Sequence, residues 1–210
     1  MKRLLSLFLV LAPIIANAQL WYIGGKAGVT LSNYKTKTPW KEVSNTGLDV
    51  GVTAFKQINS NYGLNIELHY IQKGYYHKIC NDITDQLEAN YIEVPVMIDY
   101  TFIIPSLQNW KGHFNLGVYG AYWVSGKYKT KGFDESGEDF DFAQNKASRF
   151  DFGPNGGARI EYLLKKNASL SLDFRYEMGL LDLQKKVNDN TKNTNRAFIV
   201  GISYLKLLSK

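Results

Sequence analysis

The chain is poor in the features that mark several large classes of protein. Cys80 is the only cysteine among 210 residues, so no disulfide can form within the chain. No run of 18 or more apolar residues follows the N-terminal segment, which excludes a membrane-spanning helix there. The formal charge is only +6 and the basic residues do not gather into a stripe, so no binding to nucleic acid is expected.

The first 18 residues have the three parts of a secretory signal peptide. Lys2 and Arg3 form a positive start, residues 4–15 are apolar, and Ala16-Asn17-Ala18 is a small-residue cleavage site. An uncleaved anchor helix is the alternative, but this apolar stretch is too short to cross a bilayer. We predict a cleaved signal peptide over residues 1–18 and a single domain over residues 19–210.

The rest of the chain is organised by a period of two residues. In residues 90–102, Ile92, Val94, Val96 and Ile98 recur at every second position, as on one face of a strand, and Glu93 and Asp99 lie on the other face. Seven other segments show the same alternation: residues 20–34, 46–55, 62–74, 112–129, 149–164, 168–181 and 196–208. Eight strands predict an all-β protein, an eight-stranded antiparallel up-and-down barrel.

The connections between these segments alternate in length. Residues 57–61 and 165–167 are short and residues 103–112 are of moderate length. Longer polar segments lie between them, at residues 35–45, 76–87, 130–148 and 182–195. Outer-membrane barrels combine short periplasmic turns with long outer loops, so the pattern predicts a transmembrane barrel in the cell outer membrane.

Alternation alone leaves the direction of the apolar face open. A soluble, lipocalin-like periplasmic barrel that binds an apolar ligand would turn this face inward. Two features favour an outward, lipid-facing direction. Each apolar face is long enough for a tilted membrane strand. Aromatic residues of the kind that form interfacial girdles also occur toward the strand ends of this face: Trp21, Tyr70, Tyr100, Phe102, Phe114, Phe150, Tyr162 and Tyr176.

The opposite face carries charges of both signs, which is a third argument for this direction. An eight-stranded barrel has room inside only for side chains, and buried charges there must be paired. We expect Arg175 to lie between Asp173 and Glu177, and Arg159 beside Glu161. The predicted structural network of a filled polar lumen is Lys26, Glu67, His69, Glu93, Asp99, Arg159, Glu161, Asp173, Arg175 and Glu177.

Two proline-containing sites do not fit a regular ladder. Pro95 has no N–H group to donate, and a closed barrel has no free edge where this would be harmless. We expect a bulge or locally broken pairing at Pro95, and the same at residues 153–157, which read GPNGG.

Six stretches resemble the PorT-like outer-membrane β-barrel family, which is common in Bacteroidetes. They are KAGVTLSNY, IELHYIQKGYY, NYIEVPVMIDY, FNLGVYGAYWVSGK, FDFGPNGGARIEY and LSLDFRYEMGLLDL. The most specific element is Y-I-E-x-P, residues 91–95. The resemblance covers nearly the whole mature chain and implies an eight-stranded outer-membrane barrel. The member that gives the family its name is linked to protein secretion, a role that the resemblance alone does not carry over.

Neither catalysis nor a cofactor is expected. A lipid-modifying enzyme needs a nucleophile beside a base, and nothing in the pattern places a serine near His69 or His113. His77 and Cys80 have a spacing that metal sites use, with Asp82 and Asp85 nearby, but such spacing arises often by chance. We therefore expect no metal site.

The sequence thus predicts a small outer-membrane barrel with a structural, binding or envelope-assembly role. An accessory of secretion across the membrane is the first alternative, and the soluble lipocalin-like barrel is the second. Expected partners are outer-membrane lipid and lipopolysaccharide, whose phosphates Lys127, Lys129 and Lys131 can meet. Envelope or secretion proteins are further candidates, through the loops.

Overall fold

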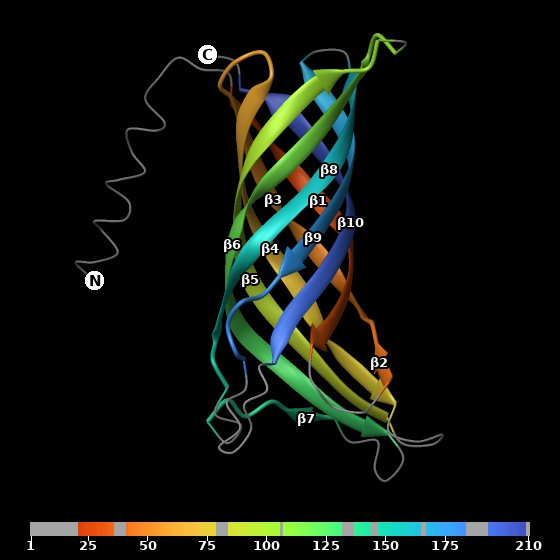
Figure 1. The fold of residues 1–210 in the computed structure, drawn as a ribbon, viewed down its shortest axis with the longest axis vertical. Coiled ribbons are helices and arrows are strands. Elements are labelled where there is room, and N and C mark those ends of the chain that lie inside the picture. Colours follow the sequence, from red (N-terminus) through yellow and green to blue (C-terminus); the bar gives the residue numbers. More distant parts are fainter. Residues whose placement is uncertain are drawn as a thin grey trace, which may run out of the picture.

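The computed structural model describes residues 21–35, 41–78, 84–105, 107–131, 137–143, 147–164, 167–183 and 193–208. Eight long strands form the wall of a barrel (Figure 1): β1 (Trp21–Lys35), β3 (Asn45–Gln57), β4 (Tyr62–Lys78), β5 (Thr84–Ile103), β6 (Trp110–Lys131), β8 (Phe150–Leu164), β9 (Ala168–Met178) and β10 (Thr194–Leu207). Two short strands, β2 (Lys41–Val43) and β7 (Glu138–Asp139), lie at one end. The predicted signal peptide lies outside the described residues.

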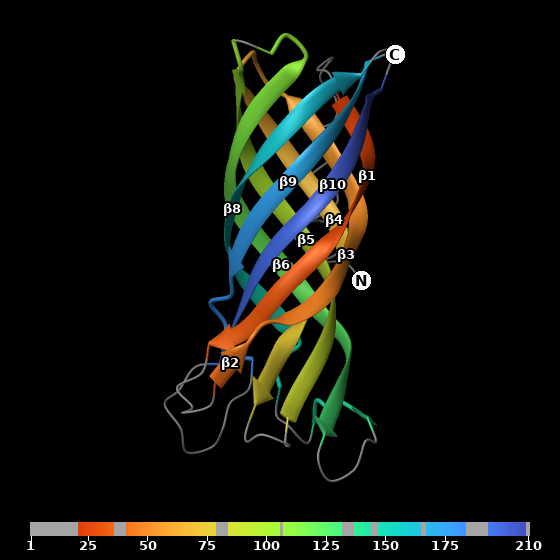
Figure 2. The ribbon, with the colours of Figure 1, turned by 90° about the vertical axis from the view of Figure 1, so that its right-hand side faces the viewer.

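The barrel is closed by its first and last strands. Each long strand pairs antiparallel with the next along the chain, and β1 pairs with both β3 and β10. Ala27, for example, lies opposite Val50 on one side and Ile202 on the other. Figure 2 shows β1 and β10 side by side. The prediction of an eight-stranded antiparallel up-and-down barrel is confirmed.

The two rims differ as the connection lengths predict. At the short-turn rim, residues 58–61, 104–109 and 165–167 join consecutive strands, and β1 begins where β10 ends. The other four connections meet at the opposite, long-connection rim. The boundaries of one predicted loop were wrong: most of residues 76–87 belongs to β4 and β5, leaving only residues 79–83 between them.

The apolar face of the wall points outward. Leu116 is 71% exposed and Ile98 63%, and the outward positions of every long strand are mainly apolar. The soluble barrel with an apolar cavity is therefore excluded. No helix long and apolar enough to cross a membrane occurs among the described residues.

Aromatic side chains pair on the outer surface near both edges of this apolar belt. Three pairs lie toward the short-turn rim and one toward the other rim: Tyr62–Tyr100 at 5.3 Å between ring centroids, Phe102–Phe114 at 5.3 Å, Trp110–Tyr162 at 5.0 Å and Tyr122–Phe150 at 5.2 Å. Such rings suit the two interfaces of a bilayer.

Pro95 interrupts one of its two ladders. Pairing between β4 and β5 stops after Ile66↔Val96 and resumes in the same register at His69↔Glu93. On the other side, the β5–β6 ladder runs through Pro95, and its register shifts between Asn90 and Tyr91. The missing N–H group explains the gap, so the prediction of broken pairing is confirmed on the β4 side.

At the GPNGG site, residues 153–157, no bulge forms, but the pairing toward β9 is locally broken as predicted. The β6–β8 ladder crosses these residues without a shift in register. Toward β9 the ladder stops at Asn155↔Glu177, and beyond Pro154 the N–H group of Leu180 donates to the carbonyl of Phe152 at 2.9 Å in the same register. The missing N–H group of Pro154 explains this gap, as at Pro95.

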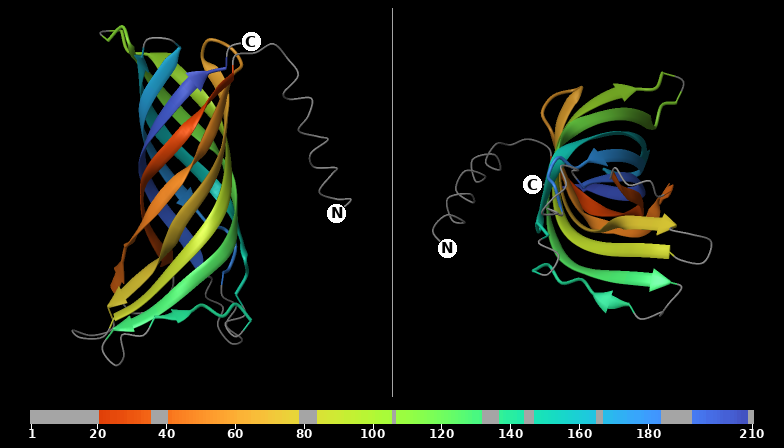
Figure 3. Two further views of the ribbon diagram at one scale, coloured as in Figure 1. Left: turned by 180° about the vertical axis from the view of Figure 1, so that it is seen from behind. Right: turned by 60° about the horizontal axis from the view of Figure 1, so that its bottom comes forward.

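Strands β4, β5 and β6 continue beyond the barrel as a five-stranded sheet in the order β2-β4-β5-β6-β7 (Figure 3). β2 pairs with β4 where β3 no longer does, and β7 pairs with β6 beyond the end of its ladder with β8. The wall is thus taller on this side of the barrel.

We predict that a charge in the middle of the belt destabilises the barrel and that an equal charge beyond it does not. Val118→Arg places a cation at the centre of the outward apolar run of β6, and it should lower the free energy of unfolding by about 2–4 kcal/mol. Ile103→Arg, at a more exposed apolar position near the short-turn rim, should change it by about 0–1 kcal/mol.

Urea unfolding in lipid vesicles measures both variants. Equal losses in the two variants would contradict the position of the belt.

Candidate functional site

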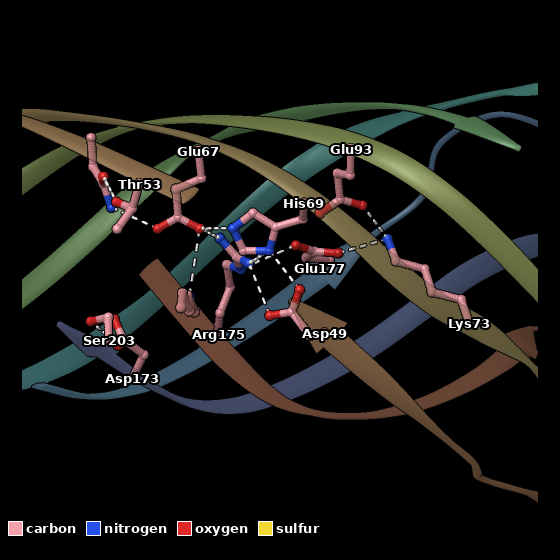
Figure 4. A network of polar contacts seen from close by, with 12 residues as sticks. Asp49, Thr53, Glu67, His69, Lys73, Glu93, Asp173, Arg175, Glu177 and Ser203 are labelled. Atoms are coloured by element: carbon pink, nitrogen blue, oxygen red, sulfur yellow. Dashed lines mark hydrogen bonds and ion pairs between the residues drawn. The ribbon is translucent and has the colours of Figure 1, made fainter. Parts of the chain in front are cut away.

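The middle of the lumen is occupied by a charged cluster centred on Glu67 (Figure 4). Its carboxylate lies 2.7 Å from Nη1 of Arg175, 2.6 Å from Nε2 of His69 and 3.5 Å from Nζ of Lys26. The other ring nitrogen of His69 lies 2.5 Å from the carboxylate of Asp49. These residues come from four strands, so the cluster ties opposite parts of the wall together.

A second set of contacts continues toward the long-connection rim. The Nζ of Lys73 lies 2.6 Å from Glu93 and 2.7 Å from Glu177. Glu177 in turn lies 3.1 Å from Nε of Arg175, which links this set to the Glu67 cluster. Each of these side chains is almost fully buried, so each charge depends on its partner.

A third set lies toward the short-turn rim. Nη2 of Arg159 is 3.1 Å from Asp99, and His113 bridges Asp99 at 2.7 Å and Glu161 at 3.0 Å. A cavity of about 30 Å³ reaches His113 and Glu161 from this rim. The three sets together fill the charged half of the lumen.

Aromatic side chains fill the other half. Trp123 stacks on Phe140 at 4.6 Å and on Tyr91 at 5.7 Å between ring centroids, and Phe142 lies edge-on to it at 4.9 Å. Phe140 and Phe142 belong to the connection between β6 and β8. Together with Trp123 and Tyr91 they form an aromatic plug at the long-connection end of the lumen. Lys73 lies 4.4 Å from the ring centroid of Tyr119, where the charged and aromatic layers meet.

All ten residues predicted for the polar network point into the lumen and are at most 8% exposed: Lys26, Glu67, His69, Glu93, Asp99, Arg159, Glu161, Asp173, Arg175 and Glu177. Their partners differ in part from the expectation. Arg175 contacts Glu177 as expected, whereas Asp173 accepts a hydrogen bond from Ser203 at 2.7 Å. Arg159 contacts Asp99, from a different strand.

Three members of the network were missed as site residues. Asp49, Lys73 and His113 were not predicted for the network, although each is at most 3% exposed inside the lumen. The alternation could have identified two of them. Lys73 lies four residues after the inward His69 on the same strand, and His113 lies two residues before the inward Asn115. The predicted polar lumen was also incomplete, since it lacked the aromatic plug.

The structure gives no support for a metal site at the His77 and Cys80 spacing. No group of three or more His, Cys, Asp or Glu side chains in the described part of the chain could hold a metal ion. Cys80 and Asp82 lie outside the described residues. The acidic stretch 133–142 is described only from residue 137, and there Glu138 and Asp139 form the exposed strand β7.

The closed wall, apolar belt and filled lumen define a transmembrane β-barrel of the outer-membrane class. Residues 17–185 match the family described as the outer membrane protein beta-barrel domain. This covers well over half of the chain, so the protein belongs to that family and is located in the outer membrane. By the general asymmetry of such barrels, the short-turn rim faces the periplasm and the long-connection rim faces the cell exterior.

Two solved structures have a similar overall fold. One is the outer membrane protein OprG from Pseudomonas aeruginosa, 16% identical, covering 90% of this chain and 96% of its own, with a TM-score of 0.54. The other is a major outer membrane protein from Thermus thermophilus, 11% identical, covering 91% of this chain and 100% of its own, with a TM-score of 0.52. At these identities the likeness concerns the fold alone. No curated protein sequence matches the chain.

We predict that Arg175 is the cation whose loss destabilises the barrel most. Arg175→Met leaves Glu67 and Glu177 without a main partner in a buried layer, and it should lower the free energy of unfolding by about 3–5 kcal/mol. The control is Lys129→Met, which breaks the part-exposed ion pair with Glu88 at 2.8 Å. This change should cost about 0.2–1 kcal/mol.

Urea unfolding in vesicles again gives the comparison. A loss for Arg175→Met no larger than that for Lys129→Met would contradict a stabilising role for the charged cluster.

Proposed function

We propose that the protein is a closed, non-catalytic membrane anchor that holds a rigid binding surface outside the cell. The observation that carries this proposal is the extension of β4, β5 and β6 beyond the apolar belt as a sheet with its own packed side. Its function is binding or structural support at the envelope, and transport through the barrel is not part of it.

The filling of the lumen supports a role without transport. An eight-stranded barrel is only wide enough for side chains to fill it. Here the charged side chains are joined in three connected sets, and the aromatic plug lies across the exterior mouth. A solute would have to break buried ion pairs and displace Phe140 and Phe142 to pass.

The shape of the exterior sheet supports a binding role. Beyond the belt, the row Gly74, Glu88, Lys127 and Asp139 crosses four strands in register, with charges of alternating sign. Opposite charges on neighbouring strands hold such a surface in one arrangement. The inner side is packed against the aromatic plug, in which Leu87 and Tyr75 are buried.

The β7 edge of this sheet is poorly suited to pairing with another strand. The outer edge strand β7 has two residues, and both are exposed acids. Short, charged edge strands discourage edge-to-edge association. The polar face of the sheet is therefore the surface that we assign to binding.

The positions of His69 and His113 support the absence of catalysis. His69 lies between Asp49 and Glu67, and His113 between Asp99 and Glu161. The hydroxyl of Thr101 approaches Nδ1 of His113 at 3.0 Å, but Asp99 occupies the same nitrogen at 2.7 Å. Both rings lie inside the barrel, away from any lipid substrate.

The closed lumen predicts that the reconstituted full-length barrel gives no steady conductance steps in planar bilayers. Removing the plug by the double change Phe140→Ala and Phe142→Ala should not open a pore either, because the charged layer beneath remains intact. Uniform, ion-selective steps from the native protein would overturn the closed-anchor proposal.

Binding at the exterior sheet predicts a specific contact at Lys127, an exposed residue of its outer face. A photo-reactive amino acid at position 127 should give one defined cross-linked product in living cells. The same probe at Leu116, in the centre of the belt, is the control for contacts within the membrane.

The product should disappear when Glu88→Arg reverses a charge on the same face while barrel insertion, followed by the heat-induced gel shift, is unchanged. A product that survives Glu88→Arg, or no product at all, would contradict binding at this face.

The role of a secretion accessory is a second candidate, because the periplasmic β5–β6 hairpin is apolar at its tip. Ile103 is 73% exposed and Leu107 is 45% exposed. The hairpin extends past the neighbouring strand, since the β4–β5 ladder ends at Tyr62↔Tyr100. Exposed apolar side chains that cluster at one place mark surfaces for association. The PorT-like resemblance agrees with this role.

For this candidate, a photo-reactive amino acid at position 107 should cross-link to an envelope protein. Leu107→Asp should impair secretion by the parent cell while the barrel still inserts. Normal secretion with Leu107→Asp would rule the candidate out and leave the exterior sheet as the assigned surface.

A further inference from the structure

A pair of cations lies on the outer surface at the exterior ends of β1 and β10. Arg196 on β10 is directly opposite Asn33 on β1, and Lys35 lies two residues further along β1. Alternation places all three on the outward side, since Tyr34 and Ala197 between them are buried in the lumen. Diagonal neighbours of this kind have Cβ atoms roughly 7–8 Å apart, so one small anion can reach both cations.

These residues stand at the edge of the apolar belt. The next outward positions of β10 toward the periplasm are Phe198, Val200, Ile202 and Tyr204. On β1 the corresponding neighbour is Leu31, which is also exposed. Arg196 and Lys35 therefore occupy the level at which lipid headgroups of the outer leaflet begin.

Neither cation is neutralised by the part of the chain that the structure describes. Among the described residues, Arg196 and Lys35 form no ion pair or hydrogen bond through their side chains, and neither does Asn33. The Nε atom of Arg196 is buried and lacks a hydrogen-bond partner. An orphaned guanidinium N–H group of this kind is costly unless an acceptor outside the described chain satisfies it.

The opposite side of the barrel provides a contrast. There the outward Lys129 of β6, which lies further from the belt, pairs with Glu88 at 2.8 Å. Lys127 lies across from Glu88 and Asp139 on its two neighbouring strands. The sequence had suggested this lysine group for lipid phosphates, whereas its described members already have acidic neighbours.

We propose that Arg196, Lys35 and Asn33 bind a phosphate group on the glycolipid of the outer leaflet. Arginine binds phosphate through two parallel N–H donors, lysine adds a point charge, and the amide of Asn33 adds a further donor. A lipid headgroup is the fitting source, because the site opens sideways at the edge of the belt and not into the lumen. The proposal rests on the outer-membrane location and is independent of the binding partner proposed above.

Native mass spectrometry of the full-length barrel in detergent tests the site with bis-phosphorylated lipid A. Wild-type protein should retain one lipid A molecule, and Arg196→Gln should weaken this binding about tenfold. Arg196→Lys keeps the charge but loses the paired N–H donors, so its affinity for lipid A should lie between those of the wild type and Arg196→Gln. Lys127→Gln is the matched control and should bind as the wild type does.

Two further arms identify the source of the phosphate. Dephosphorylated lipid A should bind no better to the wild type than to Arg196→Gln. Inorganic phosphate in millimolar excess should leave the lipid A complex intact, and displacement by it would assign the site to free phosphate instead. Equal lipid A binding by wild type and Arg196→Gln, with both giving the normal heat-induced gel shift, would overturn the proposal.

Discussion

The requirement that every backbone N–H and C=O group find a partner without water determines this structure. In hydrocarbon, an unpaired edge strand would leave a row of unsatisfied groups, so the sheet must close. The β1–β10 ladder achieves this with fourteen residue pairs, from Tyr22↔Leu207 to Lys35↔Thr194. Closure with eight strands then leaves a lumen only wide enough for side chains.

The narrow lumen in turn decides what its side chains do. The inward residues cannot be hydrated by a channel, so each buried charge must find an opposite charge or a hydrogen-bond partner inside the barrel. Glu67 of β4 meets Arg175 of β9, and Lys73 of β4 meets Glu177 of β9. These ion pairs stabilise one register of the strands, because a slip of one residue would turn the charges toward lipid.

The surfaces that remain available for binding are the two ends of the barrel and its lipid-facing side. The exterior end has a polar sheet with a packed inner side, and the periplasmic end has an apolar hairpin tip. The lipid-facing side has, at the ends of β1 and β10, two cations that no described residue pairs with. The same wall thus has three chemically different surfaces: a polar sheet, an apolar hairpin tip and a pair of cations at the edge of the apolar belt.

The sequence by itself determined the number of strands in the barrel wall, the direction of each face and the inward position of the ten predicted lumen residues. These properties are local, because alternation along one strand assigns each side chain to a face. The tertiary structure decided which inward side chains meet. Arg175 lies beside Asp173 and Glu177 in the sequence, yet its contact with Glu67 joins residues 108 positions apart.

The aromatic plug and the length of β4, β5 and β6 were likewise decided only by the fold. Phe140 and Phe142 lie in a polar connection whose pattern indicates a loop, and their packing on Trp123 depends on where the barrel mouth brings them. Register and tilt set the level of each residue along the barrel axis. A single strand contains no information about that level, since it arises only when eight strands close on one another.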